Sequence, residues 1–254
     1  MKIEMQDPAR GPHADASLMP AWGRETCGID TMEPPLLHFA LVDAHWDPET
    51  AALCYEKKLT CYARFGIAAA SVPIAENIGD GLLHLVTATD PASGEIVGGV
   101  SIYRRGPSCR LPVELALGGE ESMASEIATW RGRNVVELSG LWTEDAWRKT
   151  GLSEQLMLVA FAATHVLKAE MIIGFGHHHV LDFYATVGLA PDLSFGQFVY
   201  PNARYVATVV RGDPVRFSTL PPRHRQTVAT FAHALSHRQT VTWAAARRRS
   251  QPGP

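Results

Sequence analysis

Apolar and polar residues alternate along the first half of the chain in a way that predicts a strand, a helix and then a hairpin. Residues 36–44 alternate weakly, which is typical of a strand. Asp47 and Pro48 then form a helix start, and an apolar stripe at helical spacing follows them. Residues 81–89 and 95–103 are rich in β-favouring residues and flank a turn-rich segment, which indicates an antiparallel hairpin.

The second half of the chain continues this alternation of strands and helices. The elements that it predicts are, in order, a short acidic helix within residues 118–133, a strand at 134–144, a long apolar helix at 154–169, a strand at 170–176, a short helix at 180–188, strands at 194–200 and 204–212, and a helix from 223 to 249. This order implies an α/β (α+β) fold, a mixed, largely antiparallel sheet with helices on both faces and an additional C-terminal helix.

The composition is that of an ordinary globular protein. The chain has 254 residues, 46% of them hydrophobic, which is enough for one sizeable core. Lys and Arg number 23 against 26 Asp and Glu, a net charge of -3, and this balance argues against general nucleic-acid binding. Because there is no apolar run of about 20 residues and no signal-peptide pattern at the start, we expect a cytoplasmic protein.

The charge is unevenly distributed along the chain. From Arg211 to the end there are eight arginines and one acidic residue, a net of +7, so the preceding residues carry -10. We therefore divide the chain into a flexible N-terminal arm at 1–35, a central domain at 36–211 and a basic helical extension at 212–254. The extension is expected either to cover the sheet or a second copy of the chain, or to contact an acidic carrier protein or a membrane surface.

The segment Arg148-Lys149-Thr150-Gly151-Leu152-Ser153 joins a predicted strand to the long helix. The first amide groups of a helix have no acceptor within it, and the helix dipole adds positive potential at the same place. Gly151 lets an anion approach the backbone, and several successive N–H groups fit a pyrophosphate better than a single carboxylate. Turns of this kind also occur with no ligand, and on the spacing alone this alternative stays open.

A second motif, Phe183-Tyr184-Ala-Thr-Val-Gly188-Leu189, follows the long helix and the next strand. With R-x-x-G-x-S before the helix, residues 36–211 resemble the GCN5-related N-acetyltransferase (GNAT) superfamily, although its loop usually ends in Gly or Ala where this chain has Ser153. The resemblance implies an N-acyltransferase that binds acyl-CoA, or the phosphopantetheine thioester of acyl carrier protein, over residues 148–153. It also implies that a small-molecule amine attacks the thioester directly.

Direct attack needs a base for the ammonium proton, a donor for the thioester oxygen and an acid for the thiolate. The strand before the loop is expected to present Glu137, Ser139 and Leu141 on one face and Trp142 on the other. The resemblance implies that Glu137 is the base, acting through water, and that backbone N–H groups of Leu141 and Trp142 bind the oxygen. Tyr184 is the candidate acid. The alternatives are a half-exposed strand glutamate and a tyrosine that only packs its helix on the sheet.

A closer likeness concerns the order S-I-Y-R-R-G-x-x-x-R-L-P-V-E, an acidic helix, and V-V-E-L-S-G-L-W. It is similar to the branch that contains N-acyl amino acid synthases and acyl-homoserine-lactone synthases, which carry E-x-S-R on the equivalent strand. Here Glu137 and Ser139 match, but Gly140 stands in place of the arginine. Ser139 would contact the acceptor, and the charge for an acceptor carboxylate would come from another arginine: Arg104, Arg105 or Arg110.

Three consecutive histidines, His177, His178 and His179, follow Gly176. Imidazole binds zinc, nickel and copper, but three adjacent positions cannot all point at one ion, and no Asp, Glu or Cys set lies nearby at helical spacing. We therefore expect no metal. His177, directly after the predicted strand, is a candidate secondary base or acceptor contact.

Three hypotheses follow. The first is a GNAT-type N-acyltransferase, with N-acyl amino acids as one candidate class of product. The second, motivated by Ser153 and Gly140, is a catalytically silent CoA-binding module with the same fold. The third is an interaction protein that acts through its basic C-terminal helix. The sequence leaves open the acceptor, the acyl chain length, the choice between CoA and a carrier protein as donor, and the oligomeric state.

Overall fold

A nine-stranded sheet runs through the part of the chain that the structure, a computed structural model, describes: residues 35–67, 81–106, 110–117, 119–200 and 205–245. The strands are β1 (Leu36–Asp43), β2 (Leu83–Asp90), β3 (Glu95–Arg104), β4 (Val135–Thr143), β5 (Met171–His177), β6 (Ala190–Pro191), β7 (Phe198–Val199), β8 (Val206–Gly212) and β9 (Val241–Ala244). The helices are α1 (Pro48–Ala63), α3 (Pro112–Leu117), α4 (Glu121–Thr129), α5 (Leu152–Val166), α6 (Leu181–Thr186) and α7 (Pro222–Ser236). The predicted N-terminal arm, apart from its last residue, lies outside the described residues.

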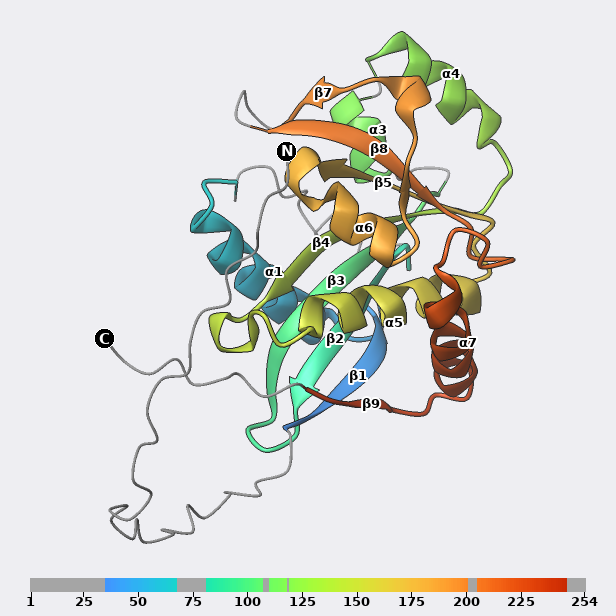
Figure 1. Ribbon diagram of the computed structural model, residues 1–254. Helices are drawn as coiled ribbons and strands as arrows, with labels where there is room; N and C mark the ends of the chain where they lie inside the picture. Colours follow the sequence, from blue (N-terminus) through green and yellow to red (C-terminus); the bar gives the residue numbers. More distant parts are fainter. Residues whose placement is uncertain (1–34, 68–80, 107–109, 118, 201–204, 246–254) are drawn as a thin grey trace, which may run out of the picture. The chain divides into compact units, whose positions relative to one another are not determined.

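The strand order is β6-β8-β5-β4-β3-β2-β1-β9, with β7 also paired to β8 (Figure 1). Among the described strands, β4 and β5 pair in parallel and the other pairings are antiparallel. Helices cover both faces, so the predicted mixed, largely antiparallel sheet with helices on both sides is confirmed.

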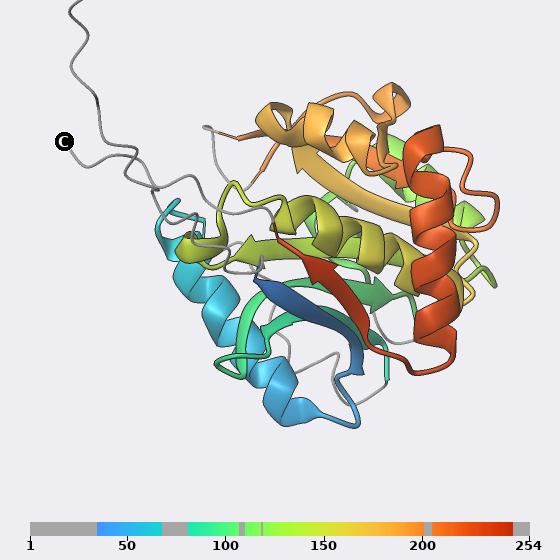
Figure 2. The same ribbon diagram turned by 60° about the horizontal axis from the view of Figure 1, so that its bottom comes forward.

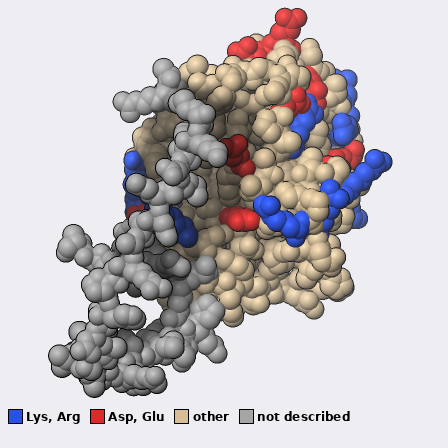
Figure 3. Space-filling view, viewed as in Figure 1, with Lys and Arg blue, Asp and Glu red and all other residues tan. Residues whose placement is uncertain are grey.

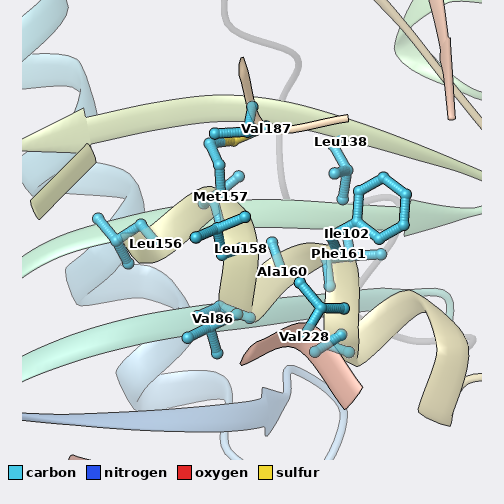
Figure 4. Close-up of a cluster of buried hydrophobic side chains, with 14 of the residues drawn as sticks. Val86, Ile102, Leu138, Leu156, Met157, Leu158, Ala160, Phe161, Val187 and Val228 are labelled. Atoms are coloured by element: carbon cyan, nitrogen blue, oxygen red, sulfur yellow. The ribbon is translucent and has the colours of Figure 1, made fainter. Parts of the chain in front are cut away.

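Each face of the sheet has its own apolar core. On one face α5 lies across the central strands and α7 packs against it (Figure 2). Figure 4 shows the residues that α5 buries there, including Leu156 and Phe161, between Val86, Ile102 and Leu138 of the sheet. The other core contains Trp130, Trp142 and the buried side of α1. Because β4 contributes residues to both cores, it is covered on both faces of the sheet.

The two parallel strands at the centre of the sheet, β4 and β5, separate after Glu137. Pairing between β4 and β5 ends at Glu137 opposite Ile173, although β4 continues to Thr143 and β5 to His177. The register between β3 and β4 also shifts, and Gly140 has a φ of +67°, the left-handed conformation that favours glycine at a β-bulge. The strands therefore open at this end of the sheet.

This bulge overturns part of the predicted alternation along β4. Glu137 lies on the α1 side with Val135, as expected from the period of two, but the extra residue shifts the phase by one. Trp142 consequently joins the α1-side core, and Leu141 packs on the α5-side core. The prediction that Trp142 faces away from Glu137 is wrong for this reason.

The predicted helix at 223–249 is correct only for its first half. α7 ends at Ser236, Arg238 adopts a φ of +54°, and Val241–Ala244 then pairs with β1 as an edge strand. The β-favouring sequence Val-Thr-Trp and the free edge of β1 together explain the strand. The arginine cluster at residues 247–249 lies outside the described residues.

The charged side chains are dispersed over the face seen in Figure 3. Acidic groups gather at the top, over the start of α4, and basic groups lie at the right, beside the start of α7. Most of this face carries no charge. Within the described chain, no helix has the length and apolar composition that a membrane span requires.

Candidate active site

A cavity of about 520 Å³ lies where β4 and β5 separate. Leu138 to Leu141 of β4 line it on one side, and Phe175 and His177 of β5 on the other. The remaining walls come from α1 and the residues after it, from β3, the start of α3 and the start of α5, from α6 and the residues before it, and from the residues next to β7 and β8. Most of their side chains are aromatic or aliphatic. The residues of these walls are Lys58, Tyr62, Phe65, Ile67, Tyr103, Pro112, Ser153, His179, Val180, Phe183, Tyr184, Tyr200 and Tyr205. An opening of this kind suits a long, flexible ligand with few charges.

The loop before α5 forms one end of this cavity. Gly151, the N-cap residue, has a φ of +92°, and its carbonyl accepts a 3.1 Å hydrogen bond from the Gln155 N–H. The preceding amides of the first turn therefore have no acceptor within the helix, and Ser153 in that turn lines the cavity. The sequence predicts an anion site at this helix start, and the N–H groups of Gly151, Leu152 and Ser153 are available for one.

The other loop side chains have structural contacts. Arg148 Nε lies 3.2 Å from Asp145 Oδ1, and its guanidinium stacks 5.1 Å from the Phe65 ring centroid. Thr150 donates its hydroxyl to the Trp147 carbonyl at 2.7 Å. Lys149, with a φ of +62°, does not line the cavity. These contacts hold the loop in shape, so the backbone is the group that faces a ligand.

Glu137 is almost fully buried, with 1% of its surface exposed. Its Oε2 accepts a 2.7 Å hydrogen bond from the backbone N–H of Val113 at the start of α3. Burial raises the pKa of Glu137 to about 8, while the Val113 hydrogen bond lowers it and the nearby Glu114 raises it. The alternative of a half-exposed surface glutamate is therefore wrong.

Tyr184 of α6 lines the cavity and lies near Glu137. Burial raises the pKa of its phenol to about 12, and the charge of Glu137 adds to the rise. Its ring packs directly on β5, because a Cβ placed at Gly176 would lie 2.6 Å from two ring carbons of Tyr184. Gly176 thus makes room for the ring, and the hydroxyl keeps its proton throughout the neutral range.

His177 also lines the cavity, at the end of β5. Its Nδ1 is buried with no hydrogen-bond partner among the described residues, and its ring stacks 5.8 Å from that of His179 and 4.9 Å from Tyr205. Burial lowers its pKa, and His179 lowers it further. A neutral imidazole with a free nitrogen can accept a proton. Among the described residues, no group of three or more His, Cys, Asp or Glu is placed to hold a metal ion.

The β4 bulge determines what the strand presents to the cavity. Beyond Glu137 the β4 amides that point away from β3 have no strand partner, because β5 has diverged. The Leu141 carbonyl accepts a 3.2 Å hydrogen bond from the Tyr62 hydroxyl, and Leu141 lines the cavity. The Trp142 side chain instead lies over Gly99, outside the cavity.

The predicted acceptor contacts are divided between two faces. Ser139 and His177 line the cavity, whereas Arg104 does not. Arg104 pairs with Val136 in the sheet and lies on the α5 side, as Ile102 of the same strand does. From there its charge lowers the pKa of His84, although burial lowers that pKa more. Arg105 has Nε 3.0 Å from the buried carboxylate of Glu114.

Two contributions from α1 were missed by the sequence analysis. Tyr62 and Lys58 both line the cavity, and Lys58 is only 4% exposed. Lys58 stands beside Glu56 and Lys57 in the sequence, where a charged residue usually indicates a solvated helix face. The apolar stripe of the sequence gives no signal for Lys58, because the buried side of α1 is formed by Ala51, Cys54, Lys58 and Cys61.

The chain was compared with family models, with curated proteins and with solved structures, and only the solved structures show a likeness. No protein-family model matches the sequence, and no curated protein matches it either. The chain is similar in structure to FeeM, an N-acyl amino acid synthase from uncultured soil microbes, with a TM-score of 0.58 and 15% identity over 76% of this chain and 98% of that chain. It is also similar to MesI, a CoA-dependent acyl-homoserine lactone synthase, with a TM-score of 0.51 and 11% identity over 75% and 95% of the two chains.

A third solved structure, the CoA-dependent acyl-homoserine lactone synthase BjaI, has a TM-score of 0.50 and 14% identity over 78% of this chain and 89% of that chain. At these identities the likeness concerns the fold. The predicted GNAT-like fold is therefore confirmed, including the likeness to the synthase branch.

Proposed function

We propose that this chain is an N-acyltransferase that moves an acyl group from acyl-CoA to the amine of a small acceptor and forms an N-acyl amino acid. The observation that carries the proposal is the cavity between β4 and β5. Ser153, in the helix start with its unpaired amides, and Tyr184 line this cavity, and Glu137 is buried near Tyr184 although it is not among the lining residues. The fold likeness to an N-acyl amino acid synthase and to CoA-dependent synthases supports the same choice of donor and product.

The pyrophosphate of CoA binds the backbone N–H groups at residues 151–153, and the pantetheine arm lies between the diverging strands. The amine nitrogen attacks the thioester carbonyl carbon. Backbone N–H groups near Leu141 and Trp142 stabilise the negative charge that develops on the carbonyl oxygen. The C–S bond then breaks, which leaves an amide and the CoA thiolate.

Three proton transfers complete the reaction. Glu137, in its ionised form, takes one proton from the acceptor ammonium through a water molecule, which frees the amine for attack. Tyr184 gives its proton to the departing thiolate and regains one from the nitrogen, which loses its second proton as the amide forms. A pKa of about 8 for Glu137 suits a base that works near neutral pH, and a pKa of about 12 keeps Tyr184 in its protonated form. His177 is the second candidate for the base because its lowered pKa leaves it neutral.

Release of free thiol from acetyl-, octanoyl- and palmitoyl-CoA, measured with a panel of amines, tests this function. We expect turnover with at least one pair, and a loss of about 100-fold or more in kcat for Glu137→Gln and for Tyr184→Phe. Tyr184→Phe keeps the ring on Gly176, so it separates proton donation from packing. The Tyr55→Phe change in α1 serves as its control, because Tyr55 is half-buried but does not line the main cavity.

Absence of both thiol release and thermal stabilisation with every thioester would overturn the proposal. His177→Gln separates the two candidate bases, because only the variant of the true base loses its activity while still binding acyl-CoA. Comparison of acyl-CoA with acyl carrier protein determines the donor. A catalytically silent module is not favoured, since its main motivation, Gly140, is explained by the left-handed bulge position.

A further inference from the structure

Lys58 is a buried cation in contact with the reaction cavity. It projects from α1, is 4% exposed, and lines both the main cavity and a smaller one behind it that includes Tyr55 and Trp142. Lysine is rarely buried to this degree without a partner. Its position therefore needs a physical explanation.

No hydrogen bond or ion pair reaches the Lys58 ammonium from the described part of the chain. Its Nζ lies 4.7 Å from the Tyr55 ring centroid, a cation–π contact that satisfies the charge only in part. The described residues that line the main cavity include no Asp, Glu or Arg. Burial lowers the pKa of Lys58 to about 8, which leaves most of the side chain protonated at pH 7. A buried, unpaired ammonium favours an anionic ligand group.

The ammonium lies at the β4 bulge. A Cβ placed at Gly140 would lie 3.0 Å from Lys58 Cδ, 3.5 Å from its Nζ and 3.6 Å from Ser101 Oγ. Lys58 enters from α1, whereas Ser153, at the predicted pyrophosphate site, enters from α5. The ammonium thus enters the cavity from the face of the sheet opposite to the predicted pyrophosphate site.

The three arginines that the sequence predicts as acceptor contacts have other positions or partners. Arg104 lies on the α5 side of the sheet, and Arg105 forms an ion pair with Glu114. Arg110 also has an interaction of its own. Lys58 is therefore the lysine or arginine that the described chain presents to the cavity.

We propose that Lys58 binds the carboxylate of the acceptor and so selects amino acids over simple amines. This inference rests on the proposed function and deepens it, because it names the group that recognises the acceptor. The carboxylate pairs with the ammonium beside Gly140, and the amine of the same small molecule points to the thioester. A charge-assisted bond in an apolar cavity supplies the selectivity. Gly140 has no side chain and so leaves room for Lys58 beside the bulge.

The test uses the full chain and matched acceptors, an amino acid and its amide, beginning with L-phenylalanine and L-phenylalaninamide and continuing through other pairs. With wild-type protein and an accepted acyl-CoA, we expect kcat/KM to be at least about 30-fold higher for the acid. Lys58→Met should remove most of this preference by lowering kcat/KM for the acid and leaving the amide nearly unchanged. Lys57→Met, the neighbouring lysine outside the cavity, is the control.

Equal losses for acid and amide in Lys58→Met would overturn the inference, because they would place the ammonium at the thioester oxygen. Equal use of acid and amide by the wild type would overturn it as well, while the proposed function would stand. Turnover of no acceptor at all would contradict the proposed function itself.

A binding measurement is independent of turnover. N-octanoyl-L-phenylalanine should raise the Tm of the wild type more than its methyl ester does, and Lys58→Met should abolish the difference. If the ester stabilises the wild type as much as the acid does, the inference is wrong.

Discussion

The Glu137 carboxyl lies on β4 between Val136 and Leu138, which face the opposite core, and Val113 donates its N–H to it. Burial favours the protonated form, so the native state holds this proton up to about pH 8, whereas the unfolded chain releases it near its usual pKa of 4.5. The same shift that suits a base therefore reduces the stability of the protein at neutral pH.

Glu137→Gln is expected to make the protein more stable at high pH. Between about pH 4.5 and pH 8 the native state binds more protons than the unfolded state, so the wild-type free energy of unfolding falls as pH rises through this window. The variant lacks this loss, and the difference from wild type should grow to the order of a few kcal/mol at pH 9 and nearly vanish at pH 4. Urea unfolding of both proteins across this pH range measures it.

The stability of both wild type and Glu137→Gln must be measured at each pH, because Lys58 also has a shifted pKa. Its lowered pKa of about 8 makes stability rise with pH above that value in both proteins, and the effect cancels in the difference. A constant difference between Glu137→Gln and wild type at all pH values would contradict the raised pKa.

Gly140→Ala tests the bulge at the same scale. The φ of +67° costs a non-glycine residue about 1–2 kcal/mol, and the new Cβ would press on Lys58 Cδ at 3.0 Å. Gly94→Ala is a matched control, since Gly94 has a φ of +72° and no atom within 4 Å of the added Cβ. We expect similar losses of stability by denaturant unfolding, and a loss of acyltransferase activity only for Gly140→Ala. Equal activity of the two variants would count against a role for the bulge.

At the scale of elements, local patterns predicted most of the sheet correctly. The strands at 81–89 and 95–103, the apolar helix after the loop and the short helix that carries Tyr184 are present within a few residues of their predicted bounds. The bulge and the separation of β4 from β5 could not be predicted, because they depend on how neighbouring strands pair. A one-residue shift leaves no mark on the hydrophobic pattern of a strand that is buried on both faces.

β9 illustrates the same limit at the end of the chain. The predicted long helix gives way to a strand that pairs with β1, and this brings Trp243 against the loop before α5. A Cβ at Gly151 would lie 3.6 Å from the Trp243 ring, and the ring centroid is 6.4 Å from that of Phe39. Deletion of residues 221–254 would remove α7 and β9 together. The loop before α5 would lose its contact with Trp243, and the face of α5 that packs against α7 would become exposed.

Trp243→Ala is expected to weaken both the fold and the loop. Loss of a half-buried tryptophan should lower the free energy of unfolding by about 2 kcal/mol and raise the Kd for CoA severalfold. Trp46→Ala is the control, because Trp46 is 81% exposed. Calorimetry and CoA titration of both variants measure the two effects. Unchanged CoA affinity in Trp243→Ala would show that the loop does not depend on β9.

At the scale of the whole molecule, four of the residues that the sequence singles out lie around one cavity, and their roles there stay predictions. They are Ser139, Ser153, His177 and Tyr184. Lys58 could not be found in this way, because its burial follows from the packing of α1 over the bulge in β4. A charged residue among other charged residues on a helix predicts exposure, and only tertiary contacts reverse that expectation.

Binding of CoA should stabilise the whole molecule through the loop at residues 151–153. A ligand at 100 times its Kd stabilises the native state by about 2.7 kcal/mol, which corresponds to a Tm increase of roughly 5–10 °C for a chain of this size. Ser153→Asp separates the loop from the fold. Its carboxylate in the first turn of α5 should leave the ligand-free Tm unchanged or slightly higher, because the helix dipole favours a negative charge there.

The same carboxylate repels a pyrophosphate, so Ser153→Asp should lose the Tm increase with CoA. Pantetheine, which has the same arm without the phosphates, is the control: any stabilisation that it gives should be similar in the wild type and the variant. Differential scanning fluorimetry with both ligands measures these shifts. A full CoA-induced increase in Ser153→Asp would mean that the phosphates bind elsewhere, whereas a fall in the ligand-free Tm would mean that Ser153 has a structural role in α5.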